Sequence, residues 1–348
     1  MLLLKTSVAT GLDTLAGMHQ ALQSAIKLEH STIPPYLYAL YSLKPGYNEE
    51  IRQLIHSIVS EEMLHMSLAC NILNAIGGQP NIDSPGFIPT YPGPLPGTVE
   101  HGLIVPLKPF SLELLSSVFM VIEEPENPLH FPQQRLMSGE VPETRTIGQF
   151  YDAIKQALLA HGKDWFTGNP DLQVSSWGIP AVTDLTSALA AIDLIVEQGE
   201  GTKDSPLDPE DEPAHYYRFA EIYYGHQLRP NPNVQPDTPP NQKYIYDGPV
   251  IPFDPAGVWP ALTNPRLQDY APGSIPLYAC QNFSYTYTGV LKALHKTFNG
   301  QPDYLRTAIG LMESLKAQAQ IIMATPAALG VSANAGPTFE YLPVLPVQ

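Results

Sequence analysis

Two long helical patterns open the chain. Over residues 13–43 apolar side chains recur at steps of three or four, and residues 50–76 repeat this spacing up to a pair of glycines. Such spacing gathers the apolar side chains on one face of a helix, and glycine commonly ends a helix. The link between the patterns, LKPGYN, is short. We therefore expect an antiparallel helical hairpin whose apolar faces meet.

Further helical patterns follow a proline-rich crossover. Ser111 can cap a helix that runs through LELLSSVFMVIEE and stops at Pro125. Helical spacing recurs at residues 146–161, 183–198, 283–298 and 303–324 and in EPAHYYRFAEIYYG, whereas strand-like alternation is almost absent. The pattern predicts an all-α fold, a four-helix bundle with long proline-rich loops and additional C-terminal helices.

The 37 prolines gather between the helical patterns and in the C-terminal tail. Loops this long are expected to wrap an ordered core. We expect residues 1–228 to form the bundle, residues 229–276 to form a proline-rich wrapping segment, and residues 277–348 to form a helical segment packed on the bundle. The wrapping segment has aromatic side chains that can anchor it to the bundle: Tyr244, Tyr246, Phe253 and Trp259.

Three polar residues interrupt the apolar faces of the first hairpin. Glu29 lies on the first helix, and Glu62 and His65 lie three residues apart on the second. Burying a carboxylate or an imidazole costs several kcal/mol unless something pairs with it. A single Glu on such a face is usually partly solvated, and Glu-x-x-His alone is common by chance. Their conjunction at matched depth predicts a cation.

The remaining ligands of this predicted site are less clearly marked. Glu123 is the preferred ligand on the third helix, with Glu124 one position further round. A fourth helix offers Glu197 and His215, although a loop separates them, and Glu212 competes because Glu212-Pro-Ala-His215 is itself a Glu-x-x-His. A helix N-terminal carboxylate that interacts with the helix dipole is the simpler interpretation of Glu212.

Several nearby residues have simpler interpretations. Glu61 is expected to be solvated or to support a ligand, and His56 and His30 are expected to face outward or to bond to backbone. Pro34-Pro35 predicts a kink or a break in the first helix. Tyrosines at helical spacing usually belong to the core, although they can also line a substrate chamber or carry radical chemistry; these are Tyr36, Tyr38, Tyr41 and Tyr151.

Composition narrows the classes of partner. The chain has 348 residues, of which 44% are hydrophobic, and its formal charge of −16 disfavours nucleic acid and anionic lipid. Two cysteines are too few for a disulfide framework, and Cys70 falls within a helical pattern where a buried thiol is common. With neither a signal peptide nor a membrane-spanning apolar run in the sequence, we expect a cytoplasmic protein without a membrane partner.

Five segments in order resemble the ferritin-like domain of iminophenyl-pyruvate dimer synthases from the violacein and rebeccamycin pathways: EHSTIPPYLYALYSL, EEMLHMSLACNILNAIGGQP, IEEPE, EQGEG and HYYRFAEI. The resemblance covers roughly residues 13–228. It implies a ferritin-like bundle of secondary metabolism, and the pathway synthases are much longer chains, so imine dimerisation is implied by analogy alone. The positions that match the family's polar core are Glu29, Glu62, His65, Glu123, Glu197 and His215.

The leading functional expectation is a di-iron enzyme that uses dioxygen to oxidise a small, amino-acid-derived substrate. Carboxylates and histidines suit two iron ions, and manganese prefers a similar ligand set. The rival interpretations are a ferritin-type iron storage protein and a metal-free scaffold domain of a biosynthetic complex. Ferritin subunits are about half as long as this chain, which favours the enzyme. The sequence leaves open whether the chain forms a homo-oligomer.

Overall fold

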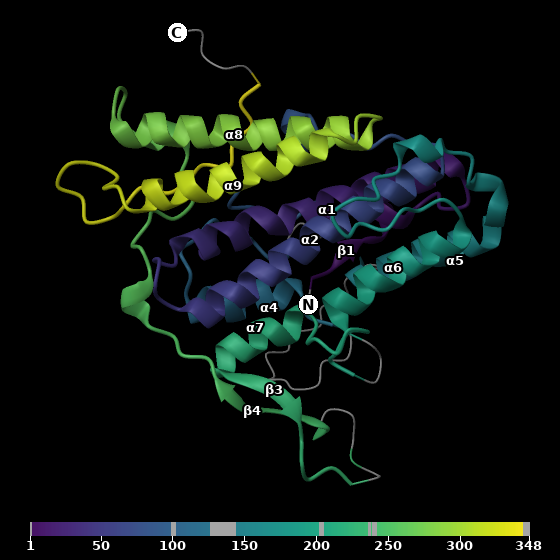
Figure 1. Cartoon of the computed structure of the whole chain (residues 1–348), viewed down its shortest axis with the longest axis horizontal. Helices are drawn as coiled ribbons and strands as arrows, with labels where there is room; N and C mark the ends of the chain where they lie inside the picture. The colour runs from purple at the N-terminus through teal and green to yellow at the C-terminus, as the bar shows by residue number, and fades with distance from the viewer. Residues whose placement is uncertain are drawn as a thin grey trace.

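The computed structural model describes residues 2–98, 102–125, 144–201, 205–235, 238 and 242–343. Helices dominate this part of the chain, as the sequence predicts, and they form stacked layers with the first hairpin in the middle (Figure 1). The long helices are α1 (Leu15–Ser42), α2 (Glu49–Ala75), α5 (Ile147–His161), α6 (Leu185–Glu200), α7 (His215–Tyr224), α8 (Ile275–Phe298) and α9 (Tyr304–Met323).

The hairpin of α1 and α2 forms the centre of the molecule. The Thr14 hydroxyl caps α1 by accepting a hydrogen bond from the Gly17 amide at 3.1 Å. The apolar side chains of both helices meet in the core, and Cys70 is fully buried there, as predicted. The polar interruptions of both apolar faces consequently lie inside the protein.

Pro34 and Pro35 do not break α1, which continues to Ser42. Proline lacks an amide hydrogen, so Pro35 leaves the Ser31 carbonyl without its helical donor. The Tyr91 hydroxyl takes the place of that donor at 2.6 Å, within the core. A side chain from the crossover after α2 therefore compensates for the proline, and the helix break considered from the sequence is wrong.

We expect Tyr91→Phe to lower the free energy of unfolding by about 1–3 kcal/mol, because it leaves the buried Ser31 carbonyl unsatisfied. Urea unfolding monitored by circular dichroism measures this loss. Tyr47→Phe is the matched control, since that ring is 45% exposed. Equal stabilities for both variants would contradict the assigned role of Tyr91.

The third helical element is irregular. Ser111 caps it as predicted, accepting from the Leu114 amide at 3.0 Å. The predicted continuous helix is instead a short α3 (Leu112–Leu114), a π-helical turn η3 (Leu115–Phe119) and a short α4 (Met120–Ile122). A π-turn rotates the residues that follow it and is often found at functional sites. Glu123, directly after α4, is buried at 7% exposure.

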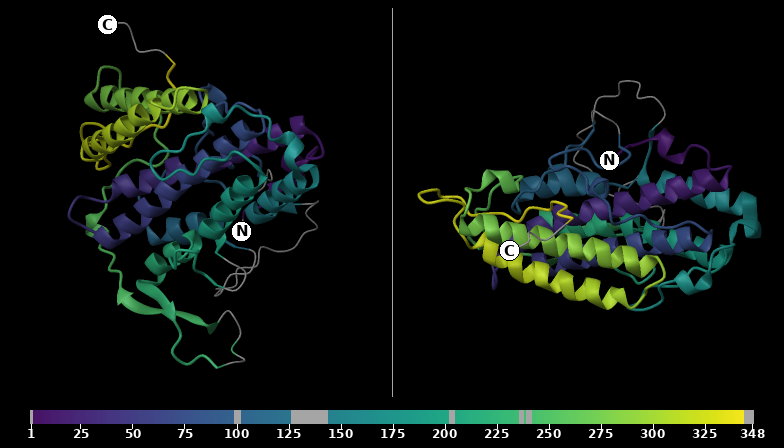
Figure 2. Two further views of the ribbon diagram at one scale, coloured as in Figure 1. Left: turned by 45° about the vertical axis from the view of Figure 1, so that its right-hand side comes forward. Right: turned by 90° about the horizontal axis from the view of Figure 1, so that it is seen from above.

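Helices α8 and α9 form a second hairpin that covers one side of α1 and α2, as Figure 2 shows from two further directions. Helix α8 begins eight residues before the predicted start at residue 283, because Ser274 caps it and Pro276 suits its first turn. Residues 251–274 make backbone hydrogen bonds with the first hairpin. The Trp259 amide, for example, donates to the Ser42 carbonyl at 2.7 Å.

Two segments near the start of the predicted wrapping segment form strands, which the sequence pattern did not predict. Strands β3 (His226–Pro230) and β4 (Tyr244–Val250) pair as an antiparallel hairpin that projects from the helices (Figure 1). Prolines and tyrosines obscure the alternation that predicts a strand. A second short pair joins β1 (Leu4–Lys5) to β2 (Thr144–Arg145).

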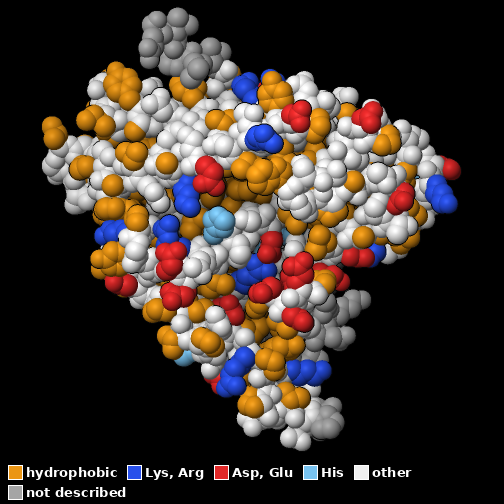
Figure 3. Space-filling model, in the orientation of Figure 1, with side chains coloured by type: hydrophobic (Ala, Val, Ile, Leu, Met, Phe, Trp, Pro, Cys, Tyr) orange, Lys and Arg blue, Asp and Glu red, His pale blue; other side chains and the backbone are white. Residues whose placement is uncertain are grey.

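Charged side chains of both signs are mixed on the surface shown in Figure 3. On the face shown in Figure 3, Lys and Arg lie beside Asp and Glu rather than in a basic patch of their own. Within the described ranges, none of the helices is both long and apolar enough to cross a lipid bilayer.

Candidate metal centre

Five of the six predicted ligands meet between α1, α2, the end of α4 and the start of α7. None of the five residues is more than 7% exposed. The ligand atoms of Glu62, His65 and His215 all lie within 4.8 Å of one another, which makes them a candidate metal-binding group among the described residues. Glu29 and Glu123 extend this group at its two ends. The sequence expectation that Glu29, Glu62 and His65 converge in the interior agrees with this geometry.

The two imidazoles face each other with similar orientations. Their ring centroids lie 5.3 Å apart with an interplanar angle of 22°. Nε2 of His65 donates to the Gln198 side-chain oxygen at 3.0 Å, and Nε2 of His215 donates to a Glu61 carboxylate oxygen at 3.0 Å. Because each Nε2 is held by an outer acceptor, each Nδ1 is left for the interior of the site.

The two oxygens of each carboxylate have different partners. One oxygen of each accepts a hydroxyl hydrogen bond: Tyr151 donates to Glu29, Thr32 to Glu62 and Tyr36 to Glu123. The other oxygen of each faces an imidazole. Three inward oxygen atoms therefore surround two inward nitrogen atoms, each oriented by a partner on its far side.

Distances between the inward atoms divide the centre into two halves. Nδ1 of His215 lies 2.9 Å from Glu62 and 3.5 Å from Glu123, whereas Nδ1 of His65 lies 3.8 Å from Glu29. Nδ1 of His215 is fully buried and makes no hydrogen bond of acceptable geometry. A buried nitrogen without a partner, beside two carboxylate oxygens, suits a metal ligand.

The protonation equilibria show how strongly the centre attracts positive charge. Burial raises the pKa of Glu62 to about 7, and the neighbouring Glu123 charge adds to the rise. Burial would lower the pKa of His215, but the neighbouring carboxylates of Glu123, Glu61 and Glu62 raise it well above its usual value. Bound protons therefore neutralise part of the buried negative charge, and a bound cation would neutralise more of it.

A cavity of about 40 Å³ reaches the centre from one side. Thr32, Glu62, His65 and Tyr151 contribute to its wall, together with apolar side chains such as Ile195. This volume holds about three molecules of the size of water. The cavity therefore offers room for only a few small molecules beside these side chains.

The remaining predicted ligands lie elsewhere. Glu197 is partly exposed on α6, where burial and the neighbouring Asp193 raise its pKa. Glu212 is exposed, because the turn before α7 directs it outward. Glu124 lines the cavity, but Glu123 is the residue that approaches His215.

The structure also places three residues that have simpler sequence interpretations. Glu61 bonds to His215, which agrees with a supporting position rather than a solvated one. His56 is exposed as expected, but the expectation for His30 is wrong. α8 covers α1 at this point, and His30 is buried against the Tyr287 hydroxyl at 2.8 Å. Burial lowers the pKa of His30 to about 3.

Sequence reasoning missed the supporting role of Gln198, which lies directly after the predicted ligand Glu197. The signal was the spacing on α6: Gln198 lies three residues after Ile195 and is buried, whereas Glu197 faces Asp193. Tyr36 and Tyr151 are core residues whose hydroxyls also contact proposed ligands, and Tyr38 bonds to the Leu262 carbonyl.

Comparison with known proteins matches the Ferritin-like family model to residues 22–224, more than half of the chain. The chain belongs to the ferritin-like family. This ferritin-like protein also superimposes on the crystal structure of a ferritin-like protein from Caulobacter vibrioides with a TM-score of 0.61 and 24% identity. The superposition covers 94% of this chain and 99% of that one, and it supports the same fold.

The ferritin-like chain is also similar to dichlorochromopyrrolate synthase from Lentzea aerocolonigenes. The two share 23% identity over 96% of this chain. The match spans 37% of the length of the synthase. The similarity is therefore to one part of a larger biosynthetic enzyme.

Proposed function

We propose that the protein is a non-haem di-iron oxidase or oxygenase that uses dioxygen to oxidise a small, amino-acid-derived molecule. The observation that carries the proposal is the set of five inward-facing donor atoms, each held by an outer hydrogen bond. The proposed iron ligands are Glu29, Glu62, His65, Glu123 and His215.

The arrangement suits two ions better than one. Glu62 has a carboxylate oxygen within 4.8 Å of both imidazoles, and each imidazole has one further carboxylate, Glu29 beside His65 and Glu123 beside His215. Carboxylate and imidazole donors of this kind match iron, with manganese as the close competitor. Ferrous iron held by these residues would supply electrons for the reduction of dioxygen. The chain's own residues orient the donors and exclude bulk water from them.

The substrate class comes from similarity rather than from geometry. The synthase relative acts in the formation of dichlorochromopyrrolate, as its name states, and this chain matches one part of it. The small cavity favours a second candidate, in which iron itself is the molecule oxidised, as in iron storage. The two candidates differ in how much iron each chain accumulates.

Elemental analysis and anaerobic reconstitution with ferrous iron test the proposal. We expect two iron ions per chain and a change in the optical spectrum when oxygen is admitted. We also expect oxygen consumption to rise when aromatic amino acids or their imino acids are added. Binding of no metal would leave the scaffold interpretation, and continued accumulation well beyond two ions would favour storage.

His65→Ala tests the ligand assignment directly. Ferrous iron stabilises the wild type by RT ln(1 + [L]/Kd), about 2.7 kcal/mol at one hundred times Kd, and we expect the variant to lose most of this gain. Differential scanning fluorimetry with and without iron measures the difference. His56→Ala is the control on the same helix, because His56 is exposed. Unchanged iron content in His65→Ala would refute the assignment.

A further inference from the structure

We propose that the two metal positions are unequal: the position beside His215 fills first and holds its ion more tightly than the position beside His65. The inference rests on the proposed function, because it assumes that the centre binds two ions. It concerns the order and strength of binding, which the ligand set alone does not specify.

The inward donors differ between the two halves. Nδ1 of His215 has two carboxylate oxygens close by, from Glu62 at 2.9 Å and Glu123 at 3.5 Å. Nδ1 of His65 has Glu29 at 3.8 Å. Two carboxylate oxygens therefore already lie close to Nδ1 of His215, so an ion bound there would attract them with less rearrangement of the side chains.

The outer partners differ in the same direction. His215 donates through Nε2 to a carboxylate, Glu61, whereas His65 donates to the neutral amide of Gln198, and both distances are 3.0 Å. A carboxylate acceptor makes the imidazole a stronger donor to metal, and replacing such a partner typically costs 10–100-fold in affinity. The two outer hydrogen bonds have the same length, but only the acceptor of His215 is charged. Metal binding is therefore expected to be tighter beside His215.

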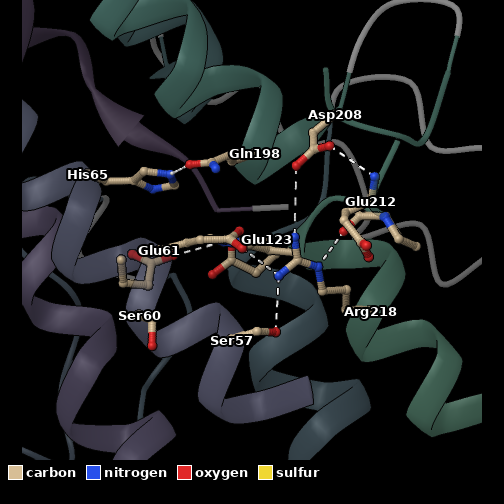
Figure 4. Close-up of polar contacts among 12 residues, drawn as sticks. Ser57, Ser60, Glu61, His65, Glu123, Gln198, Asp208, Glu212 and Arg218 are labelled. Atoms are coloured by element: carbon tan, nitrogen blue, oxygen red, sulfur yellow. Dashed lines mark hydrogen bonds and ion pairs between the residues drawn. The ribbon is translucent and has the colours of Figure 1, made fainter. Parts of the chain in front are cut away.

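A buried network holds Glu61 in this orientation (Figure 4). Arg218 donates through Nη1 to one Glu61 oxygen at 2.7 Å and to the Ser57 hydroxyl at 3.0 Å. The other Glu61 oxygen remains on His215. In the same view, His65 contacts the side-chain oxygen of Gln198. Arg218 offsets part of the charge of Glu61 but also prevents the carboxylate from turning away.

Anaerobic titration with Co²⁺ alone, followed by visible absorption and calorimetry, tests the inference. We expect two binding steps in the wild type with Kd values at least tenfold apart. Glu61→Gln should weaken the tight step 10–100-fold and leave the weak step unchanged. Gln198→Glu should strengthen the weak step and bring the two Kd values closer together.

Each variant has a control with the same change of charge at an exposed site. Glu50→Gln removes one negative charge from α2, and Gln20→Glu adds one to α1. Both controls should reproduce the wild-type titration. Circular dichroism of the metal-free variants checks folding, and if Glu61→Gln does not fold, Gln198→Glu decides the question alone.

The outcomes distinguish failure of this inference from failure of the proposed function. Two ions bound with one Kd, or equal weakening of both steps by Glu61→Gln, would overturn the inequality and leave the di-iron centre intact. An unchanged weak step in a folded Gln198→Glu would also contradict it. Failure of the wild type to bind Co²⁺ or iron would instead refute the proposed function.

Discussion

Replacing Glu62 with glutamine is expected to raise the melting temperature of the metal-free protein above pH 7 and to abolish the stabilisation by ferrous iron. Glu62 is buried, and burial together with the Glu123 charge raises its pKa from 4.5 to about 7. Glutamine resembles the neutral acid in shape, so it avoids the cost of the buried charge. It also removes a carboxylate that would help to hold the proposed ions.

The pH dependence follows from the direction of the shift. The folded pKa lies above the unfolded value, so the stabilisation is full below about pH 4.5 and is lost as the pH rises through about 7. The raised pKa of His215 acts in the same direction. We therefore expect the metal-free wild type to lose melting temperature between pH 5 and 8, and Glu62→Gln to lose less.

Thermal melts across this pH range, with and without ferrous iron, measure both effects. Glu50→Gln, at an exposed position of the same helix, should follow the wild type. A wild type whose metal-free melting temperature rises steadily from pH 5 to 8 would show that Glu62 is not buried in its charged form.

Replacing Arg218 with methionine is expected to lower the free energy of unfolding by about 3–5 kcal/mol, the usual cost of removing one partner from a buried ion pair. The Arg218 side chain is 5% exposed and bonds to Glu61 and to the Pro213 carbonyl. Asp208 lies 3.9 Å away and has side-chain exposure of 2%. Methionine fills similar space but leaves both carboxylates without this cation.

Chemical denaturation of the metal-free protein measures this loss. Arg229→Met is the matched control, because Arg229 pairs with Asp247 on the exposed face of the β3–β4 hairpin. Exposed pairs contribute little, so the control should stay close to wild type. Similar losses in both variants would show that the Arg218 network stabilises the protein no more than an exposed ion pair does.

Periodicity in the sequence determined the helical hairpin and the interior position of its polar residues. Glu29, Glu62 and His65 stood at positions of the helical repeat that must face the core, and burial of ionisable groups is costly enough to demand a partner. These conclusions depended on local spacing along α1 and α2. They needed no knowledge of how distant segments meet.

The other half of the centre depended on the tertiary structure. The π-turn rotates Glu123 into the site, and the sequence of residues 112–124 reads as a regular helix. The loop between α6 and α7 brings His215 inward while leaving Glu197 and Glu212 outside, which spacing alone does not reveal.

The hydrogen bonds that support the two imidazoles also depended on the tertiary structure. Glu61 bonds to His215, and Gln198 bonds to His65. The two residues of each pair are more than one hundred positions apart in the sequence. Local propensity decides which face of a helix is apolar, but the neighbours that a polar side chain meets depend on how the helices pack. Sequence therefore determined that α1 and α2 bury charge, and only the packing of α4, α6 and α7 decided what surrounds it.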